Sequence, residues 1–282
     1  MKNRIDILHQ SELPLIMGIL NATPDSFSDG GRYMDTGKAV EHALRMVAEG
    51  ADIIDIGGES TRPGSLPVGK EEQLARSLPI ITALRAALPD ILISIDTSLA
   101  EVAEAALLAG TDIINDTSAG SNDSAMFAVA ARHRSPIVLM HMQGRPETMQ
   151  ENPHYQHVVQ EVCDYLSARA ECALEAGISR GNILIDPGIG FGKRREDNLD
   201  LLAHLDMLVA LDYPVLLGTS RKRFMGALCD ETKAHNLLGA TVATTALGVD
   251  AGVKILRVHD VRENKQAAIV AHAIGVRKHE TS

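Results

Sequence analysis

The chain has 282 residues, 45% of them hydrophobic, and its 27 Lys and Arg against 37 Asp and Glu give a net charge of −10 at pH 7. This length is near the upper limit for one hydrophobic core, and the negative charge argues against nucleic acid or an anionic membrane as a partner. Cys163, Cys172 and Cys229 fit neither a metal-binding spacing nor a disulfide framework. Because no signal peptide or membrane-spanning stretch is visible, we expect a cytoplasmic protein.

Short runs rich in Ile, Val and Leu recur along the chain and predict β-strands. Most are apolar throughout rather than alternating, as expected of parallel strands that are buried on both faces. The eight runs are residues 15–21, 52–58, 91–97, 112–117, 137–142, 182–188, 214–220 and 255–260.

Stretches with apolar residues at helical spacing separate these runs and predict α-helices. They cover residues 37–50, 70–88, 99–110, 125–132, 157–177, 196–211, 223–229, 236–249 and 263–278, with 157–177 the longest. Gly50 would end the first of them as a C-cap. The alternation predicts an α/β fold with one domain over residues 1–282. We expect a (β/α)8 TIM barrel over 15–278, after an N-terminal extension over 1–14, rather than a doubly wound open sheet.

Polar and charged residues follow the predicted strands at their carboxyl ends, where barrels of this kind carry their catalytic groups. These residues are Asn21 with the loop 22–31, the segment 57–64, Asp96, Asn115, Asp116, His141, Asp186, Ser220, Arg221, Lys222, Arg257 and His259. The amino ends of the strands show no comparable concentration. One face of the barrel is therefore predicted to carry the chemistry.

Some of these residues have simpler interpretations. Asp116 and Asp260 are predicted to be structural, since an Asp after a strand commonly caps the next helix. His141 is predicted to be a structural histidine, because it alternates with Met140 and Met142. Lys193, Arg194 and Arg195 are interpreted as exposed cations that close a loop or helix end.

Cations gather at the ends of the second, seventh and eighth strands of this acidic chain, where phosphate sites in barrels are frequent. They are Arg62, Arg221, Lys222, Arg257 and His259, and we expect a convergent anion site. Asp96, Asn115 and Asp186 oppose it and suit a heterocycle with amino and lactam edges. No tight metal spacing is present, although a substrate-associated Mg²⁺ stays possible. No nucleophile motif supports covalent catalysis.

Eight segments carry a resemblance to a known family, in family order and over nearly the whole chain. They are MGILNATPDSFSDGG at 17–31, GGESTRPG at 57–64, SIDT at 94–97, IND at 114–116, LMHMQG at 139–144, DPGIGFGK at 186–193, SRK at 220–222 and RVHD at 257–260. Together they resemble the dihydropteroate synthases of the folate pathway. Thr117, Ala22 and Ile189 depart from residues common in that family.

The resemblance implies a barrel that forms a homodimer and a Mg²⁺-assisted condensation of 6-hydroxymethyl-7,8-dihydropterin diphosphate with p-aminobenzoate. The small-molecule products are 7,8-dihydropteroate and pyrophosphate. The implied pterin contacts are Asp96, Asn115, Met140, Asp186, Gly218, Lys222 and Arg257. The diphosphate contacts are Thr61, Arg62, Arg257 and His259, with Asn21 binding the metal. Phe27, Pro63, Phe191 and Ser220 surround p-aminobenzoate, and the catalytic set is Lys222, Arg257, Asp96, Asp25 and Asp29.

The implied chemistry needs no protein nucleophile, because the pterin ring delocalises the cation left when diphosphate departs. The protein has to stabilise the diphosphate and exclude water until the aniline attacks, and the loops 22–31 and 60–68 have the length and glycine content of lids. Two alternatives stay open: a pterin-dependent methyltransferase, which needs no diphosphate site, and a catalytically silent pterin-binding paralogue.

Overall fold

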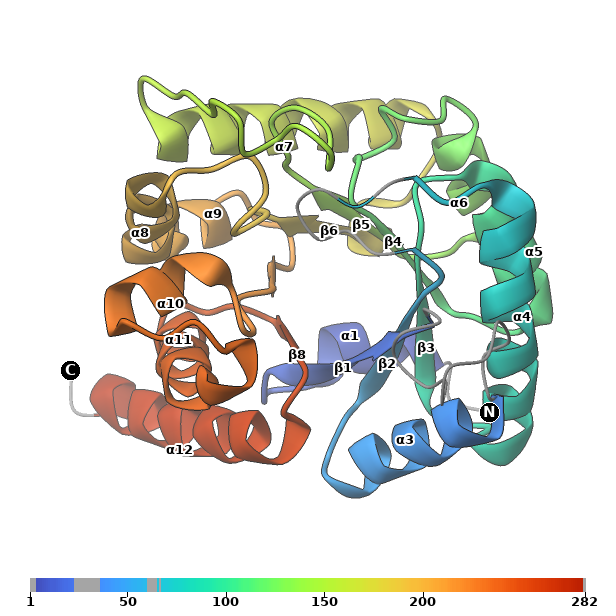
Figure 1. Ribbon diagram of the computed structural model, residues 1–282, viewed down its shortest axis with the longest axis horizontal. Helices are drawn as coiled ribbons and strands as arrows, with labels where there is room; N and C mark the ends of the chain where they lie inside the picture. Colours follow the sequence, from blue (N-terminus) through green and yellow to red (C-terminus); the bar gives the residue numbers. More distant parts are fainter. Residues whose placement is uncertain (1–3, 23–35, 60–64, 66, 281–282) are drawn as a thin grey trace.

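The computed structural model describes residues 4–22, 36–59, 65 and 67–280 of the chain. Eight parallel strands form one sheet in the order β6-β5-β4-β3-β2-β1-β8-β7, and a parallel bridge between Ile185 and Val215 brings the sheet edges together. The strands are β1 (Leu15–Asn21), β2 (Ile53–Gly57), β3 (Leu92–Asp96), β4 (Ile113–Asp116), β5 (Ile137–Met140), β6 (Ile183–Asp186), β7 (Leu216–Leu217) and β8 (Ile255–Val258). They form an inner ring with helices outside it (Figure 1), which confirms the predicted TIM barrel.

The helices follow the predicted alternation, with two corrections. They are α1 (Ile7–Gln10), α3 (Thr36–Ala48), α4 (Lys70–Ala87), α5 (Ala100–Ala109), α6 (Met126–His133), α7 (Val158–Glu175), α8 (Arg195–Ala203), α9 (Leu205–Val209), α10 (Arg223–Cys229), α11 (Leu238–Asp250) and α12 (Val261–Glu280). The single helix predicted at 196–211 is wrong, because His204 leaves helical geometry (φ −124°, ψ 37°) and divides it into α8 and α9. Among the described helices α12 is the longest with 20 residues, not α7 with 18.

Most predicted strands are longer than the observed ones. β7 has two residues where seven were expected, and β5 ends at Met140 instead of residue 142. The extra residues lie at both ends of the strands, and those after the carboxyl ends belong to the loops that leave that end of the barrel. None of the described helices is long and apolar enough to cross a membrane.

An apolar layer fills the barrel at the amino ends of its strands. Each strand contributes one or two inward side chains, and Leu8 of α1 packs onto them from below, only 2% exposed. The layer consists of Leu15, Met17, Ile53, Leu92, Ile113, Val138, Leu184, Leu216 and Ile255. This end of the barrel is therefore closed by hydrocarbon, and the inward side chains two residues further along face its other end.

A larger apolar cluster lies between the strands and the surrounding helices. Ile16, Ile54 and Ile93, which alternate with the inward residues, are fully buried there together with helical side chains such as Met46 and Ile80. Burial on both faces accounts for the continuous apolar runs in the sequence.

Candidate active site

A ring of inward side chains lies directly above the apolar layer, each two residues beyond a member of it. The ring consists of Ile19, Asp55, Ser94, Asn115, Met140, Asp186, Gly218 and Arg257. Asp55 faces Ser94 across β2 and β3, and Met140 faces Asp186 across β5 and β6. The barrel thus changes from hydrocarbon to charged and polar groups within one layer.

Arg257 joins three strands at the centre of this ring. Its Nε donates to Asp55 Oδ2 at 2.7 Å and its Nη2 to Asp96 Oδ2 at 2.8 Å. Asn115 Nδ2 donates to the same Asp55 oxygen at 3.2 Å. Although burial acts in the opposite direction, the two carboxylates raise the pKa of Arg257 above its ordinary value. The guanidinium is therefore a permanent cation with two carboxylate partners.

Asp96 and Asp55 share that one cation, so the pair carries an excess of negative charge. Burial, opposed by Arg257 and reinforced by Asp55, raises the pKa of Asp96 from 3.8 to about 7. Asp55 Oδ1 and Ser94 Oγ are buried and have no hydrogen-bond partner among the described residues. The polar ring consequently holds acceptor capacity that the described protein atoms do not use.

Asp186 and Lys222 form the opposite side of the pocket. Asp186 Oδ1 accepts a hydrogen bond from the Gly188 N–H at 2.7 Å, while burial raises the pKa of this carboxyl group. Burial and the nearby Arg257 lower the pKa of Lys222 to about 8, against the opposing effect of Asp186 and Asp96. The Lys222 Nζ lies 4.1 Å from the centre of the Phe191 ring, so an ammonium and an aromatic face meet at the pocket wall.

Met140 and Phe191 provide the apolar part of the wall. Both are buried in a small cluster with Met149, and Met142 packs against it. A flat ring entering this pocket would therefore meet hydrocarbon and sulfur on its faces and carboxylate or amide groups at its edge.

Ser220 and His259 meet at the ends of β7 and β8. Ser220 Oγ and His259 Nδ1 are 2.9 Å apart, and the His259 backbone N–H also donates to Ser220 Oγ at 3.2 Å. Arg221 was predicted to belong to the anion site with them. Its guanidinium forms an ion pair with Asp260, with Nη2 and Oδ1 at 2.6 Å.

The residues interpreted as structural have definite partners. Asp116 accepts hydrogen bonds from the backbone N–H groups of Ser118 and Gly120, and so orders the turn after β4 rather than capping α6. His141 is 6% exposed, and burial, together with Lys193, lowers its pKa to about 3. The imidazole is therefore neutral and structural, as predicted.

The interpretation of Lys193 as an exposed cation is wrong. Lys193 is only 2% exposed, and its Nζ lies 2.8 Å from His141 Nδ1. Arg194 and Arg195 are exposed as predicted, and they pair with Asp197 and Glu196. Of these three side chains, only that of Lys193 points inward, because the loop before it folds over the end of β5.

Asp55 and Lys193 are the residues that sequence reasoning missed. Asp55 could have been found, because it alternates with Gly57 at the end of β2 as Arg257 alternates with His259. Six predicted site residues lie outside the described residues: Asp25, Phe27, Asp29, Thr61, Arg62 and Pro63.

Among the described residues no group of three His, Cys, Asp or Glu side chains is arranged to hold a metal ion. Asn21, partly buried at the end of β1, has a neutral amide oxygen. One such ligand fits a Mg²⁺ ion that takes most of its other ligands from substrate phosphates and water. The donors among the described residues therefore fit a metal that arrives with an anionic substrate.

A family model described as pterin binding enzyme matches residues 17–259, which include every described residue of the polar ring. The chain belongs to the pterin-binding enzyme family. It is 50% identical over 256 residues to a dihydropteroate synthase of Streptococcus pyogenes serotype M6, covering 90% of this chain and 93% of that protein. Identity to a dihydropteroate synthase of Bacillus subtilis is 45% over 267 residues, covering 95% and 90%.

Solved structures of this family have the same fold. A Yersinia pestis dihydropteroate synthase in a sulfonamide drug complex superposes with a TM-score of 0.88 at 40% identity, covering 93% of this chain and 94% of that one. A Xanthomonas albilineans dihydropteroate synthase with 4-aminobenzoic acid gives 0.87 at 45% identity, covering 93% of each chain. Like these relatives, the chain is a transferase with dihydropteroate synthase activity.

Proposed function

We propose that the pocket above the apolar layer condenses 6-hydroxymethyl-7,8-dihydropterin diphosphate with p-aminobenzoate. The observation that supports this proposal is the convergence of acceptors and cations around the apolar cluster that contains Met140 and Phe191. Asp96, Asn115 and Asp186 lie at its edge. Arg257 donates a hydrogen bond to Asp96, and Lys222 interacts electrostatically with Asp186 and Asp96. A pterin offers the matching ring faces and N–H edges, and its diphosphate the matching charge.

The pterin binds with its edge toward the carboxylates. An ionised carboxylate accepts hydrogen bonds from two N–H groups, whereas the Asn115 amide supplies both a donor and an acceptor. Met140 lies below the ring, and Gly218 leaves the space beside the Arg257 stem open, since a Cβ there would be 3.9 Å from Arg257 Cβ. These groups fix the orientation of the ring and so the direction in which its methylene group points.

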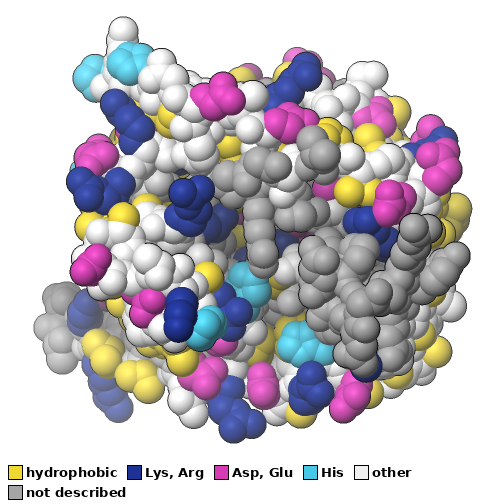
Figure 2. All heavy atoms as spheres, viewed as in Figure 1, with side chains coloured by type: hydrophobic (Ala, Val, Ile, Leu, Met, Phe, Trp, Pro, Cys, Tyr) yellow, Lys and Arg dark blue, Asp and Glu magenta, His cyan; other side chains and the backbone are white. Residues whose placement is uncertain are grey.

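The diphosphate is directed toward His259 at the rim, with Thr61 and Arg62 from the loop after β2. Figure 2 shows basic and His side chains around the hollowed centre of this face. A Mg²⁺ ion bound through Asn21 and the diphosphate would neutralise charge on the leaving group. Arg257 contributes its fixed positive charge from the pterin side.

The reaction breaks the bond between the pterin methylene carbon and the diphosphate oxygen, and the electron pair leaves with pyrophosphate. The p-aminobenzoate nitrogen then forms the new C–N bond and loses a proton. Phe191, Ser220, Phe27 and Pro63 hold the aminobenzoate ring. Lys222, Arg257 and Asp96, completed by Asp25 and Asp29 of the loop 22–31, keep the charges balanced while the pterin cation exists. Turnover of the purified protein with both substrates and Mg²⁺ tests the proposal.

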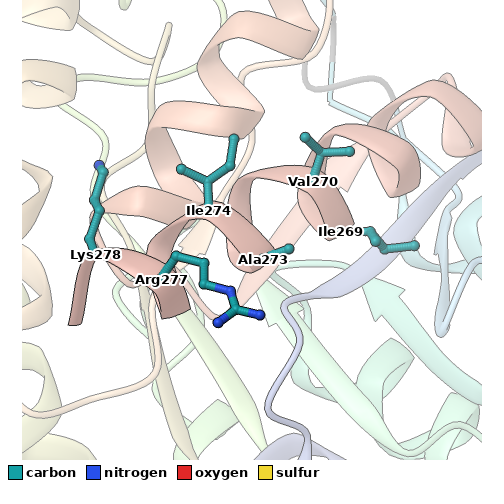
Figure 3. A pocket seen from close by; sticks show the side chains of 6 residues that line it. All are labelled: Ile269, Val270, Ala273, Ile274, Arg277 and Lys278. Atoms are coloured by element: carbon teal, nitrogen blue, oxygen red, sulfur yellow. The ribbon is translucent and has the colours of Figure 1, made fainter. Parts of the chain in front are cut away.

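We also propose that the active form is a homodimer joined through α11 and α12. Figure 3 shows a shallow pocket whose lining comes from α12 alone: Ile269, Val270, Ala273, Ile274, Arg277 and Lys278. Val270 is 58% and Ile274 55% exposed, and Leu247 of the neighbouring α11 is 59% exposed. An apolar stripe of this kind on an outer helix suits a second copy of the chain, because an isologous contact buries the same stripe on both subunits.

A further inference from the structure

Lys193 carries a buried amino group that takes no part in the proposed pterin chemistry. No carboxylate lies within ion-pairing distance of it among the described residues, although burying a charge without partners is costly. Its Nζ instead lies 3.0 Å from the Gly188 carbonyl oxygen and 3.1 Å from that of Phe191. It also lies 2.8 Å from His141 Nδ1 and 3.3 Å from the His141 carbonyl oxygen. These partners belong to one loop and to the strand end beneath it.

That loop joins β6 to α8 and is rich in glycine. Gly188, Gly190 and Gly192 all have positive φ, at 65°, 83° and 56°. A Cβ at Gly188 would lie 1.9 Å from the His141 carbonyl oxygen, so the loop backbone packs directly on the residue that follows β5. Glycine permits this close approach, but it also leaves the free loop with many alternative conformations. The packed conformation therefore depends on bonds made to the rest of the barrel.

Lys193 supplies those bonds at two points of the loop, its first turn at Gly188 and its tip at Phe191. Burial lowers the pKa of Lys193 to about 7, and both protonation states hold the loop. The ammonium donates to two carbonyl oxygens and to the neutral His141 ring, whereas the amine donates to the carbonyls and accepts from His141.

The tip of the loop reaches the active site. The Phe191 ring is 9% exposed and lies against the Lys222 Nζ, and a Cβ at Gly190 would be only 3.0 Å from Lys222 Cδ. The position of the ring on Lys222 thus follows from the position of the Phe191 backbone, which Lys193 holds through its carbonyl.

We propose that Lys193 is a positioning residue that acts through Phe191: it fixes the loop between β6 and α8 so that the ring forms a rigid wall of the p-aminobenzoate site beside Lys222. The inference rests on the proposed function of this pocket. Lys193 touches no substrate in this account. Its contribution is the pre-organisation of an aromatic contact.

Lys193→Met, which keeps the apolar stem and removes all donors, tests this role. We expect KM for p-aminobenzoate to rise about tenfold, equal to about 1.4 kcal/mol. The Kd of the free pterin alcohol, measured by calorimetry, is expected to change less than about threefold, since Asp96 and Asn115 do not belong to the loop. Asp186 is held by the Gly188 N–H and not by a carbonyl that Lys193 binds. Lys193→Arg keeps donors for the carbonyls and is expected to give a KM nearer the wild-type value.

A double-mutant cycle with Phe191→Leu separates positioning from general stability. Because Lys193 acts through the ring, Lys193→Met is expected to add little to the KM of the Phe191→Leu protein. Additive effects on KM, or an unchanged KM in the single variant, would overturn the proposal. If Lys193→Met does not fold, Lys193→Gln, which is too short to reach both carbonyl oxygens, is used in the same cycle with the same criteria.

Lys254→Met is the matched control. Lys254 is also partly buried and donates to the Ser11 carbonyl oxygen, but it lies at the opposite, amino end of the barrel. Its loss is expected to lower stability without changing KM for p-aminobenzoate. Wild-type turnover in the same assay tests the proposed function independently, so failure of one proposal is distinguished from failure of the other.

Discussion

At the scale of single residues, the site contains more buried carboxyl groups than cations to pair with them. Asp55 and Asp96 share the Arg257 guanidinium, and Asp186 lies with Lys222 on the opposite side of the site. A buried carboxylate without a full counter-charge is destabilising, yet it remains ready to accept hydrogen bonds from a ligand. The arrangement therefore lowers the stability of the empty protein and favours pterin binding, and substitution of Asp96 measures both effects.

Asp96→Asn is expected to stabilise the empty protein and to weaken pterin binding. The pKa of Asp96 is about 7 in the folded protein and 3.8 in the reference state, so the folded chain holds the extra proton between these values. Its stability consequently falls as pH rises from about 4 to about 7. The gain of the variant in free energy of unfolding should be on the order of 1 kcal/mol above about pH 7 and vanish near about pH 4.

Denaturant unfolding across this pH range, with pterin calorimetry in parallel, measures both effects. Wild-type affinity for the pterin should also fall as pH drops below about 7, because protonated Asp96 cannot accept two N–H bonds. A variant less stable than the wild type above about pH 7 would contradict this account of the carboxylate pair.

Asn21 is a weak metal ligand by itself, and this has a consequence for Mg²⁺ binding. Titration of the free protein with Mg²⁺ is expected to give no saturable heat, whereas removal of Mg²⁺ should weaken binding of the pterin diphosphate far more than binding of the pterin alcohol. Equal losses for the two ligands would show that the metal is structural or absent. Asn21→Ala should reduce the difference between them.

At the scale of elements, the loops after the strands determine what the barrel ends present. The loop after β6 contacts the end of β5 so closely that Gly188 has no room for a side chain. The Gly188 backbone N–H also donates a hydrogen bond to the Asp186 carboxylate. One tight turn therefore positions both Asp186, which we propose as a pterin contact, and Phe191, which we propose as an aminobenzoate contact.

Gly188→Ala is expected to lower the free energy of unfolding by at least about 2 kcal/mol, from the positive φ and the clash with the His141 carbonyl. It should also weaken pterin binding, because the Asp186 carboxylate loses its fixed donor. Gly239→Ala in α11 is the control: its Cβ would meet nothing within 4 Å, and it should lose no stability. Thermal unfolding compares the two, and equal Tm values would refute the close packing of the loop.

The elements were largely predictable from the sequence because a strand buried on both faces is apolar throughout. The same property made the strand ends uncertain, since Pro214 and Val215 are as apolar as the two residues that pair in β7. Alternation beyond the apolar layer predicts the polar ring, Asp55 included. The break at His204 has no Gly or Pro to mark it. The burial of Lys193 depends on how a loop folds over a distant strand, and its charged neighbours Arg194 and Arg195 indicated the opposite.

At the scale of the whole molecule, the carboxyl end of the barrel and its outer wall are proposed to have separate functions. The carboxyl ends of the strands carry the polar pocket, whereas α12 lies on the outside with its apolar stripe (Figures 1 and 3). An interface there leaves the pocket of each subunit accessible. Assembly and catalysis are therefore expected to be separable by mutation.

Ile274→Glu tests this separation by placing a charge in the stripe. We expect sedimentation to show a dimer for the wild type and a monomer for the variant, since two opposed buried charges cost several kcal/mol. Leu108→Glu is the control, because Leu108 is 75% exposed on α5, a helix on the other side of the barrel. If the Ile274→Glu protein sediments as a dimer like the wild type, this surface is not the interface.

The proposed site binds the pterin diphosphate and transfers its pterin to p-aminobenzoate. Purified protein should be supplied with both substrates and Mg²⁺ while dihydropteroate and pyrophosphate are followed together, with a control that lacks p-aminobenzoate. We expect the two products to appear in equal amounts when both substrates are present. Pterin binding without formation of either product would contradict the proposed function and indicate a silent member of the family.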